Sequence, residues 1–146
     1  MSYKRLLIVV ACVLLAAALL CFVWWYLPTT FLKNVEHTDV ARIEVFNGST
    51  GQRFAIENAD DIEYIVRKIG DVKLRKAEYS HVDGFAYSIS FKAADGTVLE
   101  RFILNASDSI RDGAIRYEVV LESYEDPLCF EYIKTLEQAR QDQTTQ

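Results

Sequence analysis

Three polar residues that lie close together in the chain, Ser80, His81 and Asp83, have types that could support nucleophilic catalysis. A serine–histidine–aspartate triad requires the histidine to lie between the other two in a chain of hydrogen bonds. Residues this near in sequence usually point in different directions, so we favour a polar loop beside Gly84. A small envelope hydrolase that uses His81 and Asp83 is kept as an alternative function.

A second candidate nucleophile is Cys129, on the apolar side of the last predicted helix. Burial among apolar side chains raises the pKa of a thiol and makes it unreactive. A place in the first turn of the helix acts in the other direction, because the helix dipole there favours a thiolate. Core packing is therefore the favoured interpretation of Cys129, and a thiol enzyme is the alternative.

Neither a metal site nor a cofactor site is predicted. The two histidines, His37 and His81, lie far apart and have no cysteine pair beside them, unlike the ligands of a zinc signature. A group of acidic residues lacks the regular oxygen-donor spacing of an EF-hand calcium loop. That group consists of Glu118, Glu122, Glu125 and Asp126. The sequence also lacks a glycine-rich phosphate loop, so we expect no cofactor.

A cluster of cations, interrupted only by Asp71, is the strongest candidate for binding a partner. In a chain with a formal net charge of -5, such a local reversal could attract an envelope protein or an anionic polymer. The interpretation that we favour for these cations is an edge strand that carries charge to prevent aggregation, and partner binding is kept beside it. The predicted partner-binding residues are Arg67, Lys68, Lys73, Arg75 and Lys76, with the nearby aromatic residues Tyr64 and Tyr79.

The composition limits the classes of protein that this chain can belong to. Its 146 residues suffice for one ordinary domain. An apolar fraction of 51% with 25% charged residues predicts a packed core. A pI near 5.0 argues against nucleic acid as a partner, because that partner requires a basic face. Three cysteines, two of them in one apolar run, exclude a disulfide-stapled scaffold.

The elements that position these residues begin with an apolar run. Residues 6–26 contain no charged residue, and as a helix they would span about 31 Å, enough to cross a bilayer. Lys4 and Arg5 precede the run, and Trp24, Trp25 and Tyr26 end it. Basic residues favour the cytoplasmic side, and amphipathic rings favour the headgroup level. We therefore predict a single-pass protein of the cell membrane, with these five residues at the membrane interfaces and the C-terminal domain outside.

Two other interpretations of the first residues are weaker. A cleaved signal peptide has a shorter apolar stretch, and cleavage after Ala18 would leave an apolar new terminus. A lipoprotein attached through Cys12 would have only six apolar residues before that cysteine, from Leu6 to Ala11. We therefore divide the chain into a cytoplasmic N-terminus (1–5), a membrane helix (6–27), a connector (28–39), an extracytoplasmic domain (40–141) and a disordered tail (142–146).

Patterns within the domain predict an α+β fold. Alternating apolar residues predict strands over 40–46, 52–56, 85–91, 97–104 and 114–121, and 72–79 is extended with a bulge near Arg75. Helical spacing predicts a helix over 58–69, and Asp126 followed by Pro127 predicts the start of another. The expected order is β-β-α-β-β-β-β-α. About six strands would form a mostly antiparallel sheet, with both helices on one face.

Four local features carry a resemblance to known domains: residues 41–45 (Ala-Arg-Ile-Glu-Val), the capped helix at 58–69, the alternating strand 85–91 before Asp95-Gly96, and residues 117–119 (Tyr-Glu-Val). With the apolar N-terminal run, the chain resembles small membrane-anchored extracytoplasmic domains of unknown function from Gram-positive bacteria. The features are structural, and the resemblance implies no activity, ligand or catalytic residue.

Together these patterns predict a membrane-anchored extracytoplasmic binding or accessory module without catalytic activity. The bilayer is its first expected partner, and an envelope protein or an anionic polymer is the second. Besides the hydrolase or thiol enzyme, one further alternative remains. The chain could be a structural membrane protein that associates with itself through its membrane helix, where Cys12, Cys21 and the alanines lie.

Overall fold

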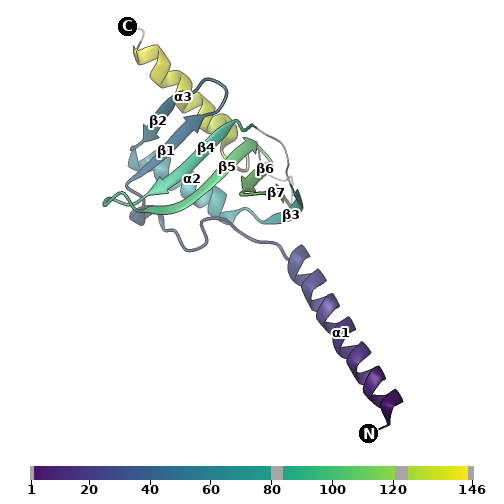
Figure 1. Cartoon of the computed structure of the whole chain (residues 1–146). Coiled ribbons are helices and arrows are strands. Elements are labelled where there is room, and N and C mark those ends of the chain that lie inside the picture. The colour runs from purple at the N-terminus through teal and green to yellow at the C-terminus, as the bar shows by residue number, and fades with distance from the viewer. Residues whose placement is uncertain (1, 80–83, 121–124, 145–146) are drawn as a thin grey trace.

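The chain folds into one sheet with two helices on one face, and a separate long helix leads into it (Figure 1). This computed structural model describes residues 2–79, 84–120 and 125–144. Within them lie three α-helices and seven strands. The helices are α1 (Tyr3–Tyr26), α2 (Ala59–Asp71) and α3 (Phe130–Thr144), with a short 3-10 turn at His37–Asp39. The strands are β1 (Arg42–Asn47), β2 (Arg53–Ile56), β3 (Leu74–Tyr79), β4 (Tyr87–Lys92), β5 (Val98–Ala106), β6 (Ser109–Asp112) and β7 (Ile115–Val119).

The strands form a single antiparallel sheet in the order β2-β1-β4-β5-β6-β7-β3. This confirms the α+β class and the antiparallel pairing. The described residues contain seven strands rather than six, because β6 was not predicted. Only Ile110 of its four residues is buried, so the segment is too short to show an alternating pattern. The bulge expected in β3 is found between Lys76 and Glu78.

The helix α1 is long and apolar enough to cross a membrane. Its 24 residues span about 36 Å at 1.5 Å per residue. Along the whole of α1, no side chain is buried against the rest of the chain. The helix includes Lys4 and Arg5 in its first turn and ends at Tyr26, two residues before Pro28.

The segment 28–39, expected to be a connector, is built partly into the domain. Thr29 and Leu74 form an isolated antiparallel bridge. Phe31 and Leu32 are buried, and the Phe31 ring makes edge-on contacts with the rings of Phe102 and Tyr117. Apolar burial of this size stabilises the position of the segment, so the chain that leaves α1 is held against the sheet.

The helix α2 forms as the sequence predicts. The side-chain oxygen of Asn58 accepts hydrogen bonds from the backbone N–H groups of Asp60 and Asp61, at 2.9 and 3.2 Å. These bonds satisfy donors that have no partner within the first turn. The apolar stripe of the helix is buried against the sheet, and it consists of Ile62, Ile65, Val66 and Ile69.

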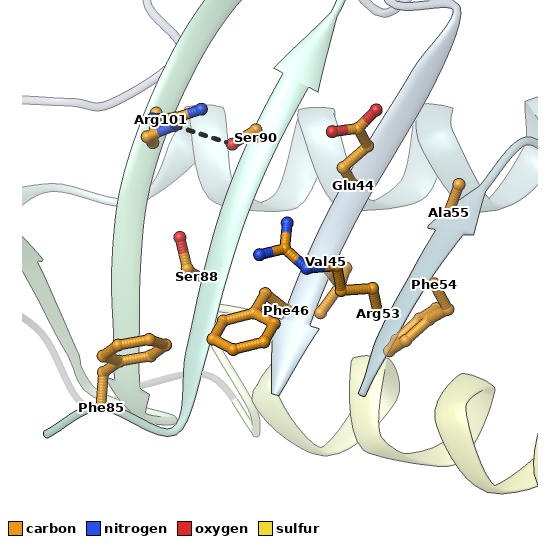
Figure 2. A pocket seen from close by; sticks show the side chains of 10 residues that line it. All are labelled: Glu44, Val45, Phe46, Arg53, Phe54, Ala55, Phe85, Ser88, Ser90 and Arg101. Atoms are coloured by element: carbon orange, nitrogen blue, oxygen red, sulfur yellow. Dashed lines mark hydrogen bonds between the residues drawn. The ribbon is translucent and has the colours of Figure 1, made fainter. Parts of the chain in front are cut away.

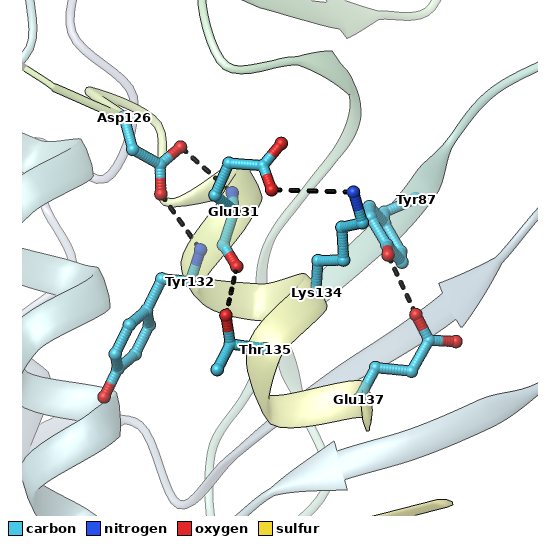
Figure 3. Close-up of polar contacts among 7 residues, drawn as sticks. All are labelled: Tyr87, Asp126, Glu131, Tyr132, Lys134, Thr135 and Glu137. Carbon is cyan, nitrogen blue, oxygen red and sulfur yellow. Dashed lines mark hydrogen bonds and ion pairs between the residues drawn. The ribbon is translucent and has the colours of Figure 1, made fainter. Parts of the chain in front are cut away.

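The helix α3 starts later than predicted. Asp126 and Cys129 have positive φ angles of 48° and 58°, which a right-handed helix does not allow, so the helix begins at Phe130. The Asp126 carboxylate still accepts hydrogen bonds from the first turn, from the backbone N–H groups of Glu131 (3.1 Å) and Tyr132 (3.0 Å) (Figure 3). Asp126 therefore caps α3 from a turn that precedes it.

Alternate residues of the same strands face opposite sides of the sheet. The covered face, which packs against α2 and α3, is apolar and contains Ile43, Val45, Ile89, Phe91, Phe102, Leu104 and Ile110, all at most 2% exposed. Figure 1 shows both helices on this face and, among the described residues, no helix on the other. We call the second side of the sheet the open face.

Candidate functional site

The predicted partner-binding residues fall into two groups, of which the first lies on α2. The Arg67 guanidinium pairs with the Glu63 carboxylate at 2.8 Å. The Lys68 ammonium donates hydrogen bonds to the Tyr64 hydroxyl and to the backbone oxygen of Glu125, both at 3.0 Å. Asp60 and Asp71 line the same shallow hollow, so charges of both signs alternate on this surface.

The second group lies on β3, beside the end of α1. The Lys76 ammonium lies 4.3 Å from the centre of a Trp24 ring and 4.6 Å from that of Trp25. Both distances are typical of cation–π contacts. Lys73 and Arg75 are exposed next to it. The backbone of Tyr79 pairs with Ile115 in β7.

A backbone joint accompanies these ring contacts. The Thr29 N–H donates to the Leu74 oxygen at 2.7 Å, and the Leu74 N–H donates to the Thr29 oxygen at 2.8 Å. Only Leu27 and Pro28 separate Thr29 from the end of α1. We refer to this pairing, together with the Lys76 contacts, as the α1–β3 joint. It brings the basic half of β3 to the helix end that carries the predicted aromatic interface residues.

The predicted interface residues occupy the two ends of α1. Lys4 and Arg5 lie in its first turn, whereas Trp24, Trp25 and Tyr26 form its last. The 20 residue steps from Lys4 to Trp24 correspond to about 30 Å along the axis, the thickness of the hydrocarbon core.

Of the proposed catalytic groups, Cys129 lies in the core. Its side chain is fully buried, and burial raises the pKa of the thiol to about 12, an effect that the nearby Lys68 charge does not offset. The thiolate needed for nucleophilic attack is therefore disfavoured. Ser80, His81 and Asp83 lie outside the described residues. Within the described ranges, no group of three or more histidine, cysteine or acidic side chains could hold a metal ion.

A groove on the open face was not predicted. It has a volume of about 570 Å³. Its lining residues come from β1, β2, β4 and β5 and from Phe85, just before β4 (Figure 2). Its floor contains small side chains, and its walls contain aromatic rings and guanidinium groups. We define the groove by seven of its lining residues: Glu44, Phe46, Arg53, Phe85, Ser88, Ser90 and Arg101.

The charges around the groove are mostly positive. The Glu44 carboxylate is bound by the Lys92 ammonium (2.7 Å) and by Nε of Arg42 (3.1 Å). The hydrogen bond from Lys92, helped by both positive charges, holds the pKa of the Glu44 carboxyl below its ordinary value. Arg53 and Arg101 add two further cations. The groove lining therefore contains two arginines and one carboxylate, which two neighbouring cations neutralise, in a domain that is acidic as a whole.

The sequence contains the parts of this groove but not their assembly. Alternation within single strands places Arg42, Glu44, Ser88, Ser90 and Lys92 on polar sides. The structure adds the strand order, which brings Arg53 of β2 and Arg101 of β5 to either side of β1 and β4. The sequence feature that could have indicated the groove is the recurrence of an arginine at a solvent-facing position in several strands.

A buried polar cluster near α3 has a structural role. The Glu137 carboxylate is 6% exposed and accepts a hydrogen bond from the Tyr87 hydroxyl at 2.8 Å (Figure 3). It also accepts one from the Asn47 side-chain amide at 2.9 Å. A buried carboxylate is stable only where such donors replace water. The cluster fastens α3 to β1 and β4.

No protein-family model, curated protein or solved structure matches the chain.

Proposed function

We propose that this chain is a single-pass membrane protein that holds a non-catalytic binding domain close to the outer surface of the cell membrane. The observation that carries the proposal is the α1–β3 joint. It fixes one edge of the sheet beside the aromatic end of a helix that is long enough to span a bilayer. A domain on a slack tether would lack such a joint.

The charge distribution supports an orientation for this domain. Without Lys4 and Arg5, the chain has 14 basic and 21 acidic residues, a net charge of -7. Anionic headgroups repel such a domain as a whole but attract Lys73, Arg75 and Lys76 near the joint. These opposing effects favour an orientation in which β3 faces the bilayer and the acidic remainder of the domain points away from it. Lys4 and Arg5 favour the cytoplasm for the N-terminus.

Binding rather than catalysis is favoured by what the described residues offer. Cys129 is buried with a raised pKa, which disfavours thiol chemistry. The open face instead presents a groove whose polar groups are arginines, serines and a carboxylate neutralised by cations. These groups are suited to holding a charged ligand.

Cysteine labelling in intact cells tests the orientation. Cys12 and Cys21 are first replaced by alanine, and one cysteine is then added in the exposed β1–β2 hairpin (Ser49→Cys) or before α1 (Ser2→Cys). A maleimide that cannot cross membranes should label the Ser49→Cys variant in intact cells. It should label the Ser2→Cys variant only after permeabilisation. The reverse pattern, or labelling of both variants in intact cells, would overturn the proposed topology.

The distance of the domain from the bilayer is tested in nanodiscs. A fluorophore is attached to the full chain through Lys73→Cys or, as the matched control, Ser49→Cys. The sheet order places the β1–β2 hairpin at least five strand spacings from β3, about 24 Å. Lipids with a quencher in the headgroup should therefore quench the Lys73→Cys probe several-fold more strongly. Equal quenching at both sites would contradict a domain that is held by its β3 edge.

A further inference from the structure

We propose that the groove on the open face binds an acidic peptide segment of a partner protein. This inference deepens the proposed binding role, on which it rests, by naming the surface and the ligand chemistry. The surface differs from the α2 and β3 cations predicted from the sequence. The groove residues come from β1, β2, β4 and β5 and from Phe85, just before β4.

Two guanidinium groups are available for carboxylates. Among the described residues, no carboxylate pairs with Arg53 or Arg101. Arg101 donates from Nε to the Ser90 hydroxyl at 2.9 Å, which orients the side chain and leaves its two terminal nitrogens for a ligand. Arg53 is held with its guanidinium 4.6 Å from the centre of the Phe46 ring. Planar guanidinium groups of this kind bind carboxylates through two parallel hydrogen bonds.

Aromatic rings provide an apolar contact beside these cations. The rings of Phe46 and Phe85 lie 5.7 Å apart (Figure 2). Gly48 permits this approach, because a Cβ atom at that position would lie 2.3 Å from the backbone oxygen of Phe85. The Gly48 N–H also donates to the Ala86 oxygen at 2.9 Å. The rings are therefore positioned before any ligand arrives, which lowers the entropic cost of binding.

The floor of the groove favours a peptide over a continuous polyanion. Ser88, Ser90 and Ala55 are small, so an extended backbone has room above β1 and β4. The serine hydroxyls can exchange hydrogen bonds with peptide groups. Glu44 lies among them, and a polymer with a negative charge on every unit would place charge against its carboxylate. A peptide can instead direct an N–H group there.

The separation of the two arginines suits an extended segment. From β2 to β5 is three strand spacings, about 14 Å, and the two residues are offset by about 7 Å along the strands. In an extended peptide, side chains at positions i and i+4 point the same way about 13 Å apart. Because arginine side chains are long, two carboxylates at this spacing can reach both guanidinium groups. The residue between them then faces Phe46.

The place of the groove in the sheet argues against a lipid as the occupant. β4, which forms part of its floor, lies four strand positions from β3, about 19 Å away. In the proposed orientation, β3 faces the bilayer, and the groove is therefore held away from it, where a partner protein can reach it.

A synthetic peptide tests the inference on the full chain in phosphatidylcholine nanodiscs. The probe is acetyl-Glu-Ser-Phe-Ser-Glu-amide carrying a fluorophore, and binding is followed by fluorescence anisotropy. We expect it to bind at least tenfold more tightly than the uncharged acetyl-Gln-Ser-Phe-Ser-Gln-amide. Arg53→Gln and Arg101→Gln should each weaken binding about fivefold or more. Lys134→Gln, an equal charge change on α3, should leave it unchanged, because Lys134 is exposed and pairs with Glu131 away from the groove.

Three outcomes would overturn the inference: equal binding of the charged and uncharged peptides, an equal loss of peptide binding in the Lys134→Gln control, or binding of inorganic polyphosphate that is tighter than peptide binding and is lost in both groove variants. Because Arg53 and Arg101 are exposed, circular dichroism is expected to show that both variants fold. Nanodiscs expose both sides of the membrane, so failure here is distinguishable from failure of the topology experiment.

Discussion

The two faces of the sheet are made from alternate residues of the same strands, yet they differ in burial and in polarity. On β5, Phe102 is 2% exposed in the core, while its neighbour Arg101 is exposed beside the groove. On β4, Ile89 is buried against the helices, whereas Ser88 lies on the open face. The covered face stabilises the fold, and the open face is left free to acquire a ligand.

The largest predicted difference between the faces is in stability. Phe102→Ala should lower the free energy of unfolding by about 3 to 5 kcal/mol, because it leaves a cavity beside Phe31 and Phe91. Phe46→Ala, the same change on the open face, should cost far less, because the ring is only partly buried. Urea denaturation of the full chain in detergent measures both. Similar losses in the two variants would contradict the division of roles.

A smaller loss of stability is expected when the buried polar cluster around Glu137 is disrupted. Glu137→Ala removes the acceptor of the Tyr87 hydroxyl and the Asn47 amide and leaves both donors buried. The expected cost is about 1 to 3 kcal/mol. The matched variant Glu137→Gln keeps one acceptor oxygen, so the same urea titration should show a smaller loss. An unchanged midpoint for Glu137→Ala would mean that α3 is held by apolar contacts alone.

The Asp126 cap of α3 should contribute less to stability than the Glu137 cluster does. Asp126→Ala removes the acceptor for two backbone N–H groups in the first turn, at an expected cost of about 1 kcal/mol. Asp126→Asn retains an acceptor and should recover part of this loss. Thermal unfolding followed by circular dichroism compares the two. Equal melting temperatures for Asp126→Ala and the unmodified chain would show that the turn holds itself without the side chain.

The smallest effect on stability is expected on the open face. Arg101→Gln removes a charge from an exposed side chain and should change the free energy of unfolding by no more than about 0.5 kcal/mol. Ser90→Ala, which removes the hydrogen-bond partner of Arg101, is the companion variant. Both are measured in urea as above. A loss above about 1 kcal/mol for Arg101→Gln would show that the groove supports the fold.

Local signals in the sequence predicted which helices and strands form more successfully than where each one begins and ends. The helix α2 was recognised because its cap, its apolar stripe and its charge distribution all agree within 13 residues. The predicted start of α3 was wrong because Asp and Pro are also common in turns. The positive φ angles at Asp126 and Cys129 cannot be inferred from residue types. β6 was missed because four residues carry too little pattern.

The groove was beyond prediction for a different reason. Its residues come from strands that are neighbours only in the sheet order, and alternation within one strand does not reveal which strand lies beside it. The predicted cation cluster shows the reverse problem. Residues near in sequence were separated onto α2 and β3, where Arg67 pairs with Glu63 and Lys76 contacts two tryptophans. The sequence predicted the binding role of this cluster, which remains a prediction.

The pairing of Thr29 with Leu74 also has a mechanical meaning. Only two residues lie between α1 and this pairing, so a force or a rotation applied to the helix would be transmitted directly to the sheet edge. A long slack tether would absorb the same motion. The load would fall first on β3 and β7, at the opposite edge from β2. If α1 crosses a membrane and the groove binds a ligand, as we propose, both events would act on one continuous hydrogen-bonded sheet.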